Sequence, residues 1–447
     1  MSYALQGEPE SPARVPLIAL RHHDRMIISG IIAQHAEEAA DLWLLRDACA
    51  HDPQFRVRDL RRLDERVEAH VDALRIAGEG ASEVVNEILP AKKAAQVFAL
   101  SLWTFAVGTR SPMGTRSKMD ELYGLGTSSP EVSRGLISAL GWLPFDTAEP
   151  HIQHLVKSEY PAYRRAAISA AAVHRRNTRA DLQRHLADPD RLARARALRA
   201  VGETGVSECF PALLACLNDD SRDCRFWAAW SLALRSDNNR AIAVLTSELE
   251  SRDSPYRMHA LELVLQRMAP VEASRLAERL RANRGDERTA SIAAGILGWC
   301  DAIPWLLEQM KVTAMARVAA AAFTMITGLD LAHEQMRGSK PEEFAAGPTD
   351  DPEDDNVESD EDEGLPWPDV TKLESWWYAH ADDFAPRSRC LLGKPLSVEG
   401  LNHALRAGRQ RERSAAALEL AVRSPGEPLF NIRMPGFRQV RLLGITK

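Results

Sequence analysis

The chain has 447 residues, of which 45% are hydrophobic and 27% charged, as expected for a soluble globular protein. Its net charge of -7 gives no global electrostatic argument for binding nucleic acid. The six cysteines form no CxxC pair, which argues against a disulfide framework or a zinc site and favours buried, reduced thiols.

No targeting or membrane-spanning segment is expected. The apolar run 15–20 is short and ends in Arg21, His22 and His23. No apolar stretch approaches the roughly 20 residues that a membrane helix needs. We therefore expect a cytoplasmic protein that makes no use of a membrane.

The first part of the chain is predicted to be a disordered tail, 1–14, followed by an N-terminal helical domain, 15–129. Apolar residues recur at three- and four-residue steps over 25–51 and 57–77, which predicts two amphipathic helices. A third helical stretch covers 83–107, and Pro90 is expected to split it.

Several single residues of this domain are open to interpretation. Gly78 follows the second helix and is predicted to be its C-cap. His35 lies beside the apolar stripe of the first helix, and we interpret it as a core-edge histidine bonded to a neighbour. Asp64 and His70 are six residues apart on one helix, too poor a shared face for a catalytic pair.

Near-repeats organise residues 130–335. Each unit begins with a polar turn, continues as an Ala- and Leu-rich helix and ends with a shorter second helix. One apolar position of the first helix recurs at intervals of about 30 residues, within the range of helical repeat proteins. These anchors are Leu140, Ala171, Val201, Leu232, Leu263, Leu297 and Ile326. Such a period predicts an α-solenoid of about seven helix pairs, in which each unit buries its apolar face against its neighbours.

The pattern stops in an acidic segment, 336–366, which is predicted to be a disordered loop. Between Pro341 and Gly364 it contains twelve Asp or Glu residues and no Lys or Arg. A tolerated insertion is the favoured interpretation, and mimicry of a nucleic-acid or basic-partner surface is the alternative. The remainder, 367–447, is predicted to be a C-terminal helical part with an extended tail. Its helices at 396–406 and 408–422 could form a displaced last repeat that closes the array.

The repeats resemble HEAT-like repeats most clearly at 189–217, where a Pro-Asp turn precedes an Arg- and Ala-rich helix. Further motifs resemble a bacterial family of uncharacterised HEAT-like proteins that are often encoded beside type VI secretion genes. These motifs include Leu63-Asp64-Glu65-Arg66-Val67, Ile326-Thr327-Gly328-Leu329-Asp330, Leu365-Pro366-Trp367-Pro368-Asp369 and Gly408-Arg409-Gln410-Arg411-Glu412-Arg413. The resemblance implies a cytoplasmic accessory protein of secretion and supplies no catalytic residues.

Catalytic motifs are missing from the sequence. It contains no Walker A loop, GxGxxG, GxSxG or HExxH pattern. HEAT-like di-iron hydroxylases need several His-Glu dyads, and the chain has one, His333-Glu334. We therefore expect no catalytic residues, no metal and no cofactor, and an enzyme is the least favoured function.

Arginine is concentrated in the early repeats. Between Lys157 and Arg199 there are eleven basic residues and four acidic ones. A solvated face is one interpretation, and an acidic protein partner or the chain's own acidic loop is another. Nucleic acid is disfavoured because no aromatic residues are interleaved for base stacking. The candidate partner-binding residues of this basic patch are Arg164, Arg165, Arg175, Arg176, Arg179, Arg184 and Arg194.

The predicted function is that of a non-enzymatic protein-binding scaffold whose second helices line a concave face. With the family resemblance, the partner would be a type VI secretion effector, and the protein its adaptor or chaperone. The alternative is an immunity protein that binds and blocks a co-encoded toxin. Deletion of the gene would separate the two, because self-intoxication indicates immunity and lost effector delivery indicates an adaptor.

Overall fold

The computed structural model describes residues 27–108, 115–332, 335–342, 344, 360–384 and 388–445. The predicted tail 1–14 and the dyad His333-Glu334 lie outside these residues. The described chain is almost entirely helical, and its sheet is one short antiparallel hairpin of β1 (Cys390–Leu391) and β2 (Lys394–Pro395). No described helix is both long and apolar enough to cross a bilayer.

The helices follow one another with short connections. Those before the repeats are α1 (Ser29–His51), α2 (Val57–Ala77), α3 (Ser82–Ile88), α4 (Ala94–Gly108) and α5 (Thr115–Gly126). The first helices of the repeats are α6 (Ser133–Trp142), α8 (Pro161–Val173), α10 (Arg191–Thr204), α12 (Arg222–Arg235), α14 (Arg257–Arg267), α16 (Glu287–Leu297) and α18 (Thr313–Thr327). The second helices are α7 (Phe145–Val156), α9 (Arg179–His185), α11 (Phe210–Cys216), α13 (Asn239–Glu250), α15 (Pro270–Ala282) and α17 (Ile303–Met310). The C-terminal helices are α19 (Val370–His380), α20 (Val398–Ala407), α21 (Gln410–Arg423) and α22 (Gly436–Leu442). Short 3₁₀ turns occur at η1 (Gly78–Ala81), η2 (Ser207–Cys209), η3 (Cys300–Ala302) and η4 (Ala381–Asp383).

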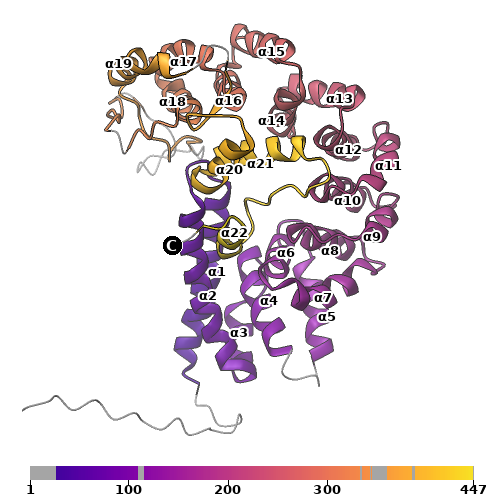
Figure 1. The fold of residues 1–447 in the computed structure, drawn as a ribbon. Coiled ribbons are helices and arrows are strands. Elements are labelled where there is room, and N and C mark those ends of the chain that lie inside the picture. The colour runs from indigo at the N-terminus through magenta and orange to yellow at the C-terminus, as the bar shows by residue number, and fades with distance from the viewer. Residues whose placement is uncertain are drawn as a thin grey trace, which may run out of the picture.

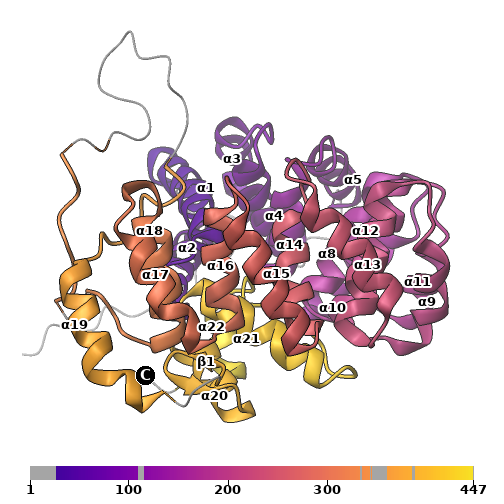
Figure 2. The same ribbon diagram turned by 90° about the horizontal axis from the view of Figure 1, so that it is seen from above.

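The repeats stack into a curved α-solenoid, which confirms the predicted fold class (Figure 1). The seven predicted anchors are all buried, with exposed fractions between 0% and 6%. The first helices pack on one another around the inside of the curve, and the second helices lie outside them (Figure 1; Figure 2). The expectation that second helices line the concave face is therefore wrong. The first helices are rich in Ala, and these small side chains let neighbouring first helices approach one another closely. The first helices therefore occupy the shorter, inner arc of the solenoid.

Arginines near the start of the first helices join successive repeats. Arg164 binds Asp188 through two bonds of 2.7 Å. Arg194 binds Asp219 in the same way, with bonds of 2.9 and 3.1 Å. Each acid lies in the turn before the next first helix, so a charge-assisted, bidentate contact fixes the spacing of neighbouring units.

In the last repeats, the corresponding first-helix arginines bind carboxylates of the acidic segment. Arg288 binds Asp362 at 2.5 and 2.9 Å, and Arg317 binds Asp360 at 2.7 and 2.8 Å. Most of the predicted disordered loop, namely 343 and 345–359, lies outside the described residues. The end of the segment is ordered against α16 and α18, far from the arginines of the early repeats.

We expect Asp362→Ala to lower the free energy of unfolding by about 2 kcal/mol, because it leaves Arg288 without its bidentate partner. The Asp362 side chain is 5% exposed, so water replaces the lost bonds poorly. The neighbouring Glu363→Ala removes the same charge from an exposed side chain and should change stability by less than about 0.5 kcal/mol. Urea unfolding of both variants measures the difference, and equal effects would contradict a structural role for Asp362.

The helices α20, α21 and α22 lie inside the curve, whereas α19 packs against α17 at its outer edge (Figure 1). The helix α21 packs against α12 and α14, and α22 packs against α2 (Figure 1). The predicted helix pair 396–406 and 408–422 is therefore present as α20 and α21, but it packs inside the curve instead of continuing the array. The prediction that an extended tail lies over the last helices is wrong. Residues 424–435, which we call the strap, cross the concave face as an irregular chain between α21 and α22. The strap consequently occupies the surface that was expected to receive a partner.

The N-terminal helices contact the far end of the solenoid. Arg56, at the start of α2, binds Asp330, which follows α18, at 2.7 Å. Arg409 binds the same carboxylate at 3.2 Å, and the Gln410 N–H donates to the Phe55 carbonyl at 2.8 Å. The N-terminal helices thus cap the first repeat, where α4 packs against α6, and also reach the end of the last one.

Two smaller predictions for the first helices hold. Gly78 caps α2 with a φ of 60°, in the left-handed range that favours glycine. The His35 and His70 Nδ1 atoms lie 3.0 Å apart, which confirms His35 as a hydrogen-bonded histidine at the core edge. The six cysteines are free, and Cys216 is the one that is not fully buried.

Candidate partner-binding cleft

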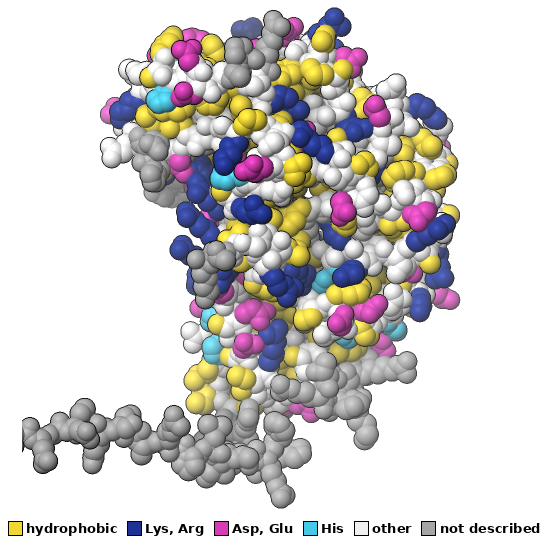
Figure 3. Space-filling view, in the orientation of Figure 1, with side chains coloured by type: hydrophobic (Ala, Val, Ile, Leu, Met, Phe, Trp, Pro, Cys, Tyr) yellow, Lys and Arg dark blue, Asp and Glu magenta, His cyan; other side chains and the backbone are white. Residues whose placement is uncertain are grey.

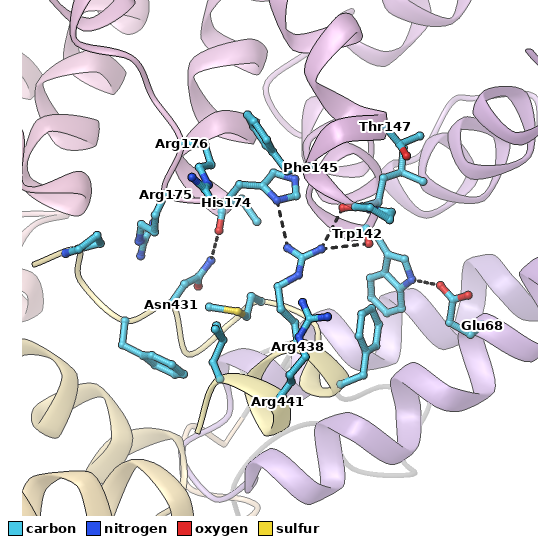
Figure 4. A pocket seen from close by; sticks show the side chains of 18 of the residues that line it. Glu68, Trp142, Phe145, Thr147, His174, Arg175, Arg176, Asn431, Arg438 and Arg441 are labelled. Atoms are coloured by element: carbon cyan, nitrogen blue, oxygen red, sulfur yellow. Dashed lines mark hydrogen bonds between the residues drawn. The ribbon is translucent and has the colours of Figure 1, made fainter. Parts of the chain in front are cut away.

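A cleft of about 1060 Å³ opens between α2, α4, the α6–α8 region and the last part of the chain (Figure 4). We call it the basic cleft. Its cationic side chains are Arg75, Arg175, Arg176, Arg438 and Arg441, and Glu68 is its carboxylate. Trp142, Phe145 and Phe437 add aromatic surface. Charged and aromatic side chains from distant parts of the sequence therefore meet in one concavity.

Arg438 fixes one wall of the basic cleft. Its guanidinium donates to the carbonyls of Gly141 at 3.1 Å and Leu143 at 3.0 Å, so it caps the end of α6 (Figure 4). It also lies 3.2 Å from His174 Nδ1, while His174 Nε2 lies 2.9 Å from the Leu140 carbonyl. Burial lowers the pKa of His174 to about 4, so a neutral ring accepts from Arg438 and donates to Leu140.

Arg175 fixes the opposite wall. Its backbone has a φ of 58°, and its side chain is only 14% exposed. The guanidinium donates to the Leu429 carbonyl of the strap at 2.7 Å and to the Ala172 carbonyl at 2.5 Å. Burial lowers the pKa of Arg175 to about 10. This arginine holds the strap and has little capacity left for a partner.

Two cationic side chains of the basic cleft are available to bind a partner. Arg176 and Arg441 are exposed, and within the described residues neither forms an ion pair. The Arg176 guanidinium lies 5.8 Å from the centroid of the Phe145 ring. Arg75, by contrast, is bound to Glu68 at 2.8 Å. The free positive charge of the cleft is therefore contributed by α8's C-terminal turn and by α22.

The structure distributes the seven predicted patch residues over several places. Arg164 and Arg194 join repeats, with side chains 12% and 19% exposed. Arg179 is exposed and lies 3.7 Å from Glu208, and Arg184 is exposed on α9. Arg165 is half-buried on α8. Arg175 and Arg176 alone among the seven line the basic cleft.

Phe437, Arg438 and Arg441 complete the cleft and were not among the predicted partner-binding residues. Their one visible signal is a set of arginines at 433, 438 and 441 in a Pro- and Gly-rich tail. No group of three or more His, Cys, Asp or Glu residues in the described ranges is arranged to hold a metal ion.

The stacked helix pairs define the chain as an all-α, HEAT-like α-solenoid. Residues 179–266 match a family model described as HEAT repeats, which covers α9 to α14. A search of curated proteins and a search of solved structures each find no significant match. HEAT repeats are typical of scaffolds for protein–protein interaction, because stacked units expose a long surface.

Proposed function

We propose that this protein is a non-enzymatic protein-binding scaffold that takes an acidic segment of its partner into the basic cleft. The observation that carries the proposal is the pair of exposed, unpaired arginines, Arg176 and Arg441, beside aromatic rings in a large cleft. Arginine and aromatic side chains are favoured anchors of protein interfaces. Figure 3 shows Lys and Arg side chains among hydrophobic ones in the middle of the face that the strap crosses.

The sequence resemblance adds a cellular setting to this proposal: an adaptor or chaperone that binds a type VI secretion effector. The immunity protein that blocks a co-encoded toxin is the second role. Both roles need one macromolecular partner and could use the same cleft. They differ in the lifetime of the complex, because an adaptor must release its partner and an inhibitor must not.

We expect the double variant Arg176→Glu, Arg441→Glu to weaken partner binding by about 100-fold, since each reversal replaces attraction by repulsion at the cleft mouth. It should also reduce the salt dependence of the affinity, because the screened charge pairs are lost. The partner is first captured from the native host and identified by mass spectrometry. Its affinity is then measured with purified proteins at two salt concentrations.

The matched control is Arg179→Glu, Arg184→Glu, which makes the same charge change on α9, outside the residues that line the basic cleft. Binding that is lost in both double variants would indicate a diffuse effect of net charge. Unchanged binding in the Arg176, Arg441 variant would rule out the cleft as the docking site.

A further inference from the structure

A second cavity, of about 490 Å³, lies next to the basic cleft, and the two share lining residues of the strap such as Leu429 and Asn431. We call it the central cavity. The inward faces of α1, α6, α10, α12 and α14 form its walls. Residues 429–435 of the strap and the helix α21 cover it. The cavity therefore lies within the ring of helices and is partly open to solvent, and its size is that of a small-molecule site.

Arginine dominates the charged groups that line the central cavity. The guanidiniums are those of Arg46, Arg134, Arg175, Arg196, Arg199 and Arg433, and the carboxylates are those of Asp47, Glu203 and Glu262. Arg134 is paired with Asp47, and Arg46 with Asp64, which lies outside the cavity. The excess of positive charge must therefore come from the remaining four arginines.

Glu203 is shared by three of these arginines. It lies 2.9 Å from Arg196, 3.0 Å from Arg199 and 3.9 Å from Arg175. Burial opposes ionisation of this carboxyl, but the three guanidiniums outweigh it and lower the pKa of Glu203 to about 2. One carboxylate facing three guanidiniums leaves two positive charges uncompensated.

Two guanidiniums have donors to spare. Arg196 Nη1 is buried and has no hydrogen-bond partner in the part of the chain that the structure describes. The Arg433 side chain has no hydrogen bond or ion pair within the described residues, although it lines the cavity. For Arg196 this is a buried donor on a charged group, which costs several kcal/mol when unsatisfied, so such groups are normally paired. Arg433 is exposed, and its guanidinium is free to turn toward a ligand. Their free donors indicate a place for an acceptor that carries negative charge.

Glu262 lines the central cavity but does not fully supply the negative charge that these arginine donors need. Within the described residues it has no hydrogen bond or ion pair. Burial raises the pKa of Glu262 to about 7, against the charges of Arg433 and Arg411. The carboxyl is therefore partly protonated at neutral pH and can donate a hydrogen bond to an anion. Trp43, Trp142 and Trp230 also line the cavity and offer apolar surface.

We propose that the central cavity binds a small molecule with at least two negative charges, held by the free donors of Arg196 and Arg433. The planar guanidinium fork matches phosphate and carboxylate oxygens, so a phosphorylated metabolite and a polycarboxylate share the required chemistry. Because Arg433 belongs to the strap and Arg196 to α10, the bound anion would tie the strap to the repeats. This inference does not depend on the proposed function, since neither Arg196 nor Arg433 lines the basic cleft.

The test is calorimetric titration of the full-length protein with pyrophosphate and, separately, with citrate, at constant ionic strength. We expect saturable binding of one molecule per chain and a higher unfolding temperature, since a ligand that binds only the folded state stabilises it. Binding of pyrophosphate alone would identify phosphate chemistry, and binding of citrate alone would identify carboxylate chemistry. Absence of saturable binding by both anions would overturn the proposal.

Variants then locate the site. Arg433→Gln should weaken the affinity by about tenfold or more, and Arg433→Lys should restore part of it by returning the charge. Because the Arg433 side chain makes no bond in the fold, its variants should unfold at the wild-type temperature without ligand. The control is Arg441→Gln in the basic cleft, for which we expect unchanged affinity. Equal affinity of wild type and Arg433→Gln would also overturn the proposal.

Discussion

Replacing Asp64 by alanine should lower the free energy of unfolding by about 3–5 kcal/mol, the range seen when a buried ion pair loses one partner. The Asp64 side chain is 0% exposed and accepts from Arg46 Nε at 2.8 Å. Arg46 is itself 7% exposed, so the substitution leaves a buried guanidinium without its counter-ion. The backbone N–H of Gly436 loses its acceptor as well.

The loss of local stability should be largest where the N-terminal helices contact the strap and α22. Arg46 also donates to the carbonyls of Arg433 and Met434, at 2.9 Å each. The buried pair therefore joins α1 and α2 to the end of the strap and the start of α22. We expect limited proteolysis of the variant to cut first between α21 and α22, before the repeats are attacked.

The matched control for Asp64→Ala is Asp72→Ala on the same helix. Asp72 is 62% exposed and binds Arg75 at 2.7 Å. An exposed pair of this kind contributes about 0–1 kcal/mol. Urea unfolding of the two variants should separate them by at least about 2 kcal/mol. Similar, small losses would mean that the strap is held by its other contacts.

The regular part of the fold was predictable because it depends on local periodicity. The predicted range 57–77 coincides with α2 (Val57–Ala77), and the recurring anchors such as Leu140 and Ile326 are buried. Apolar residues at three- and four-residue steps define one helix face, and a constant repeat period makes each face meet the next. These signals need no knowledge of distant contacts.

The position of the strap was not predictable in this way. Much of its anchoring comes from distant arginines that bind main-chain carbonyls. Arg235, for example, donates to the Glu427 carbonyl at 2.7 Å across 192 residues. Main-chain acceptors carry no sequence signal, so the tail was expected to lie over the last helices.

The seven arginines of the predicted basic patch do not form one surface, and the reason is related. Arg164 and Arg194 were counted as free charge, whereas each binds an acid in the following turn, Asp188 or Asp219. The sequence does contain a signal for this pairing. The two arginines are one repeat length apart, and so are the two acids, which means that each pair recurs in register with the repeats.

The second large effect is expected for Gly135→Ala in α6, which should lower the free energy of unfolding by about 3 kcal/mol through overpacking. A Cβ at this position would lie 2.0 Å from the Ala94 carbonyl oxygen and 3.0 Å from the Phe98 nitrogen. Both atoms belong to the backbone of α4, so no flexible side chain can move aside. The two helices would have to separate, and the packing between the N-terminal helices and the first repeat would loosen.

A second glycine in a helix provides the contrast. At Gly30 in α1, no atom lies within 4 Å of an added Cβ. Gly30→Ala should therefore raise stability by up to about 1 kcal/mol, since alanine is the better helix former. The same chemical change thus has opposite signs at the two sites, and urea unfolding of both variants measures it. If both variants were equally or more stable than wild type, α4 and α6 could not be as close as the structure places them.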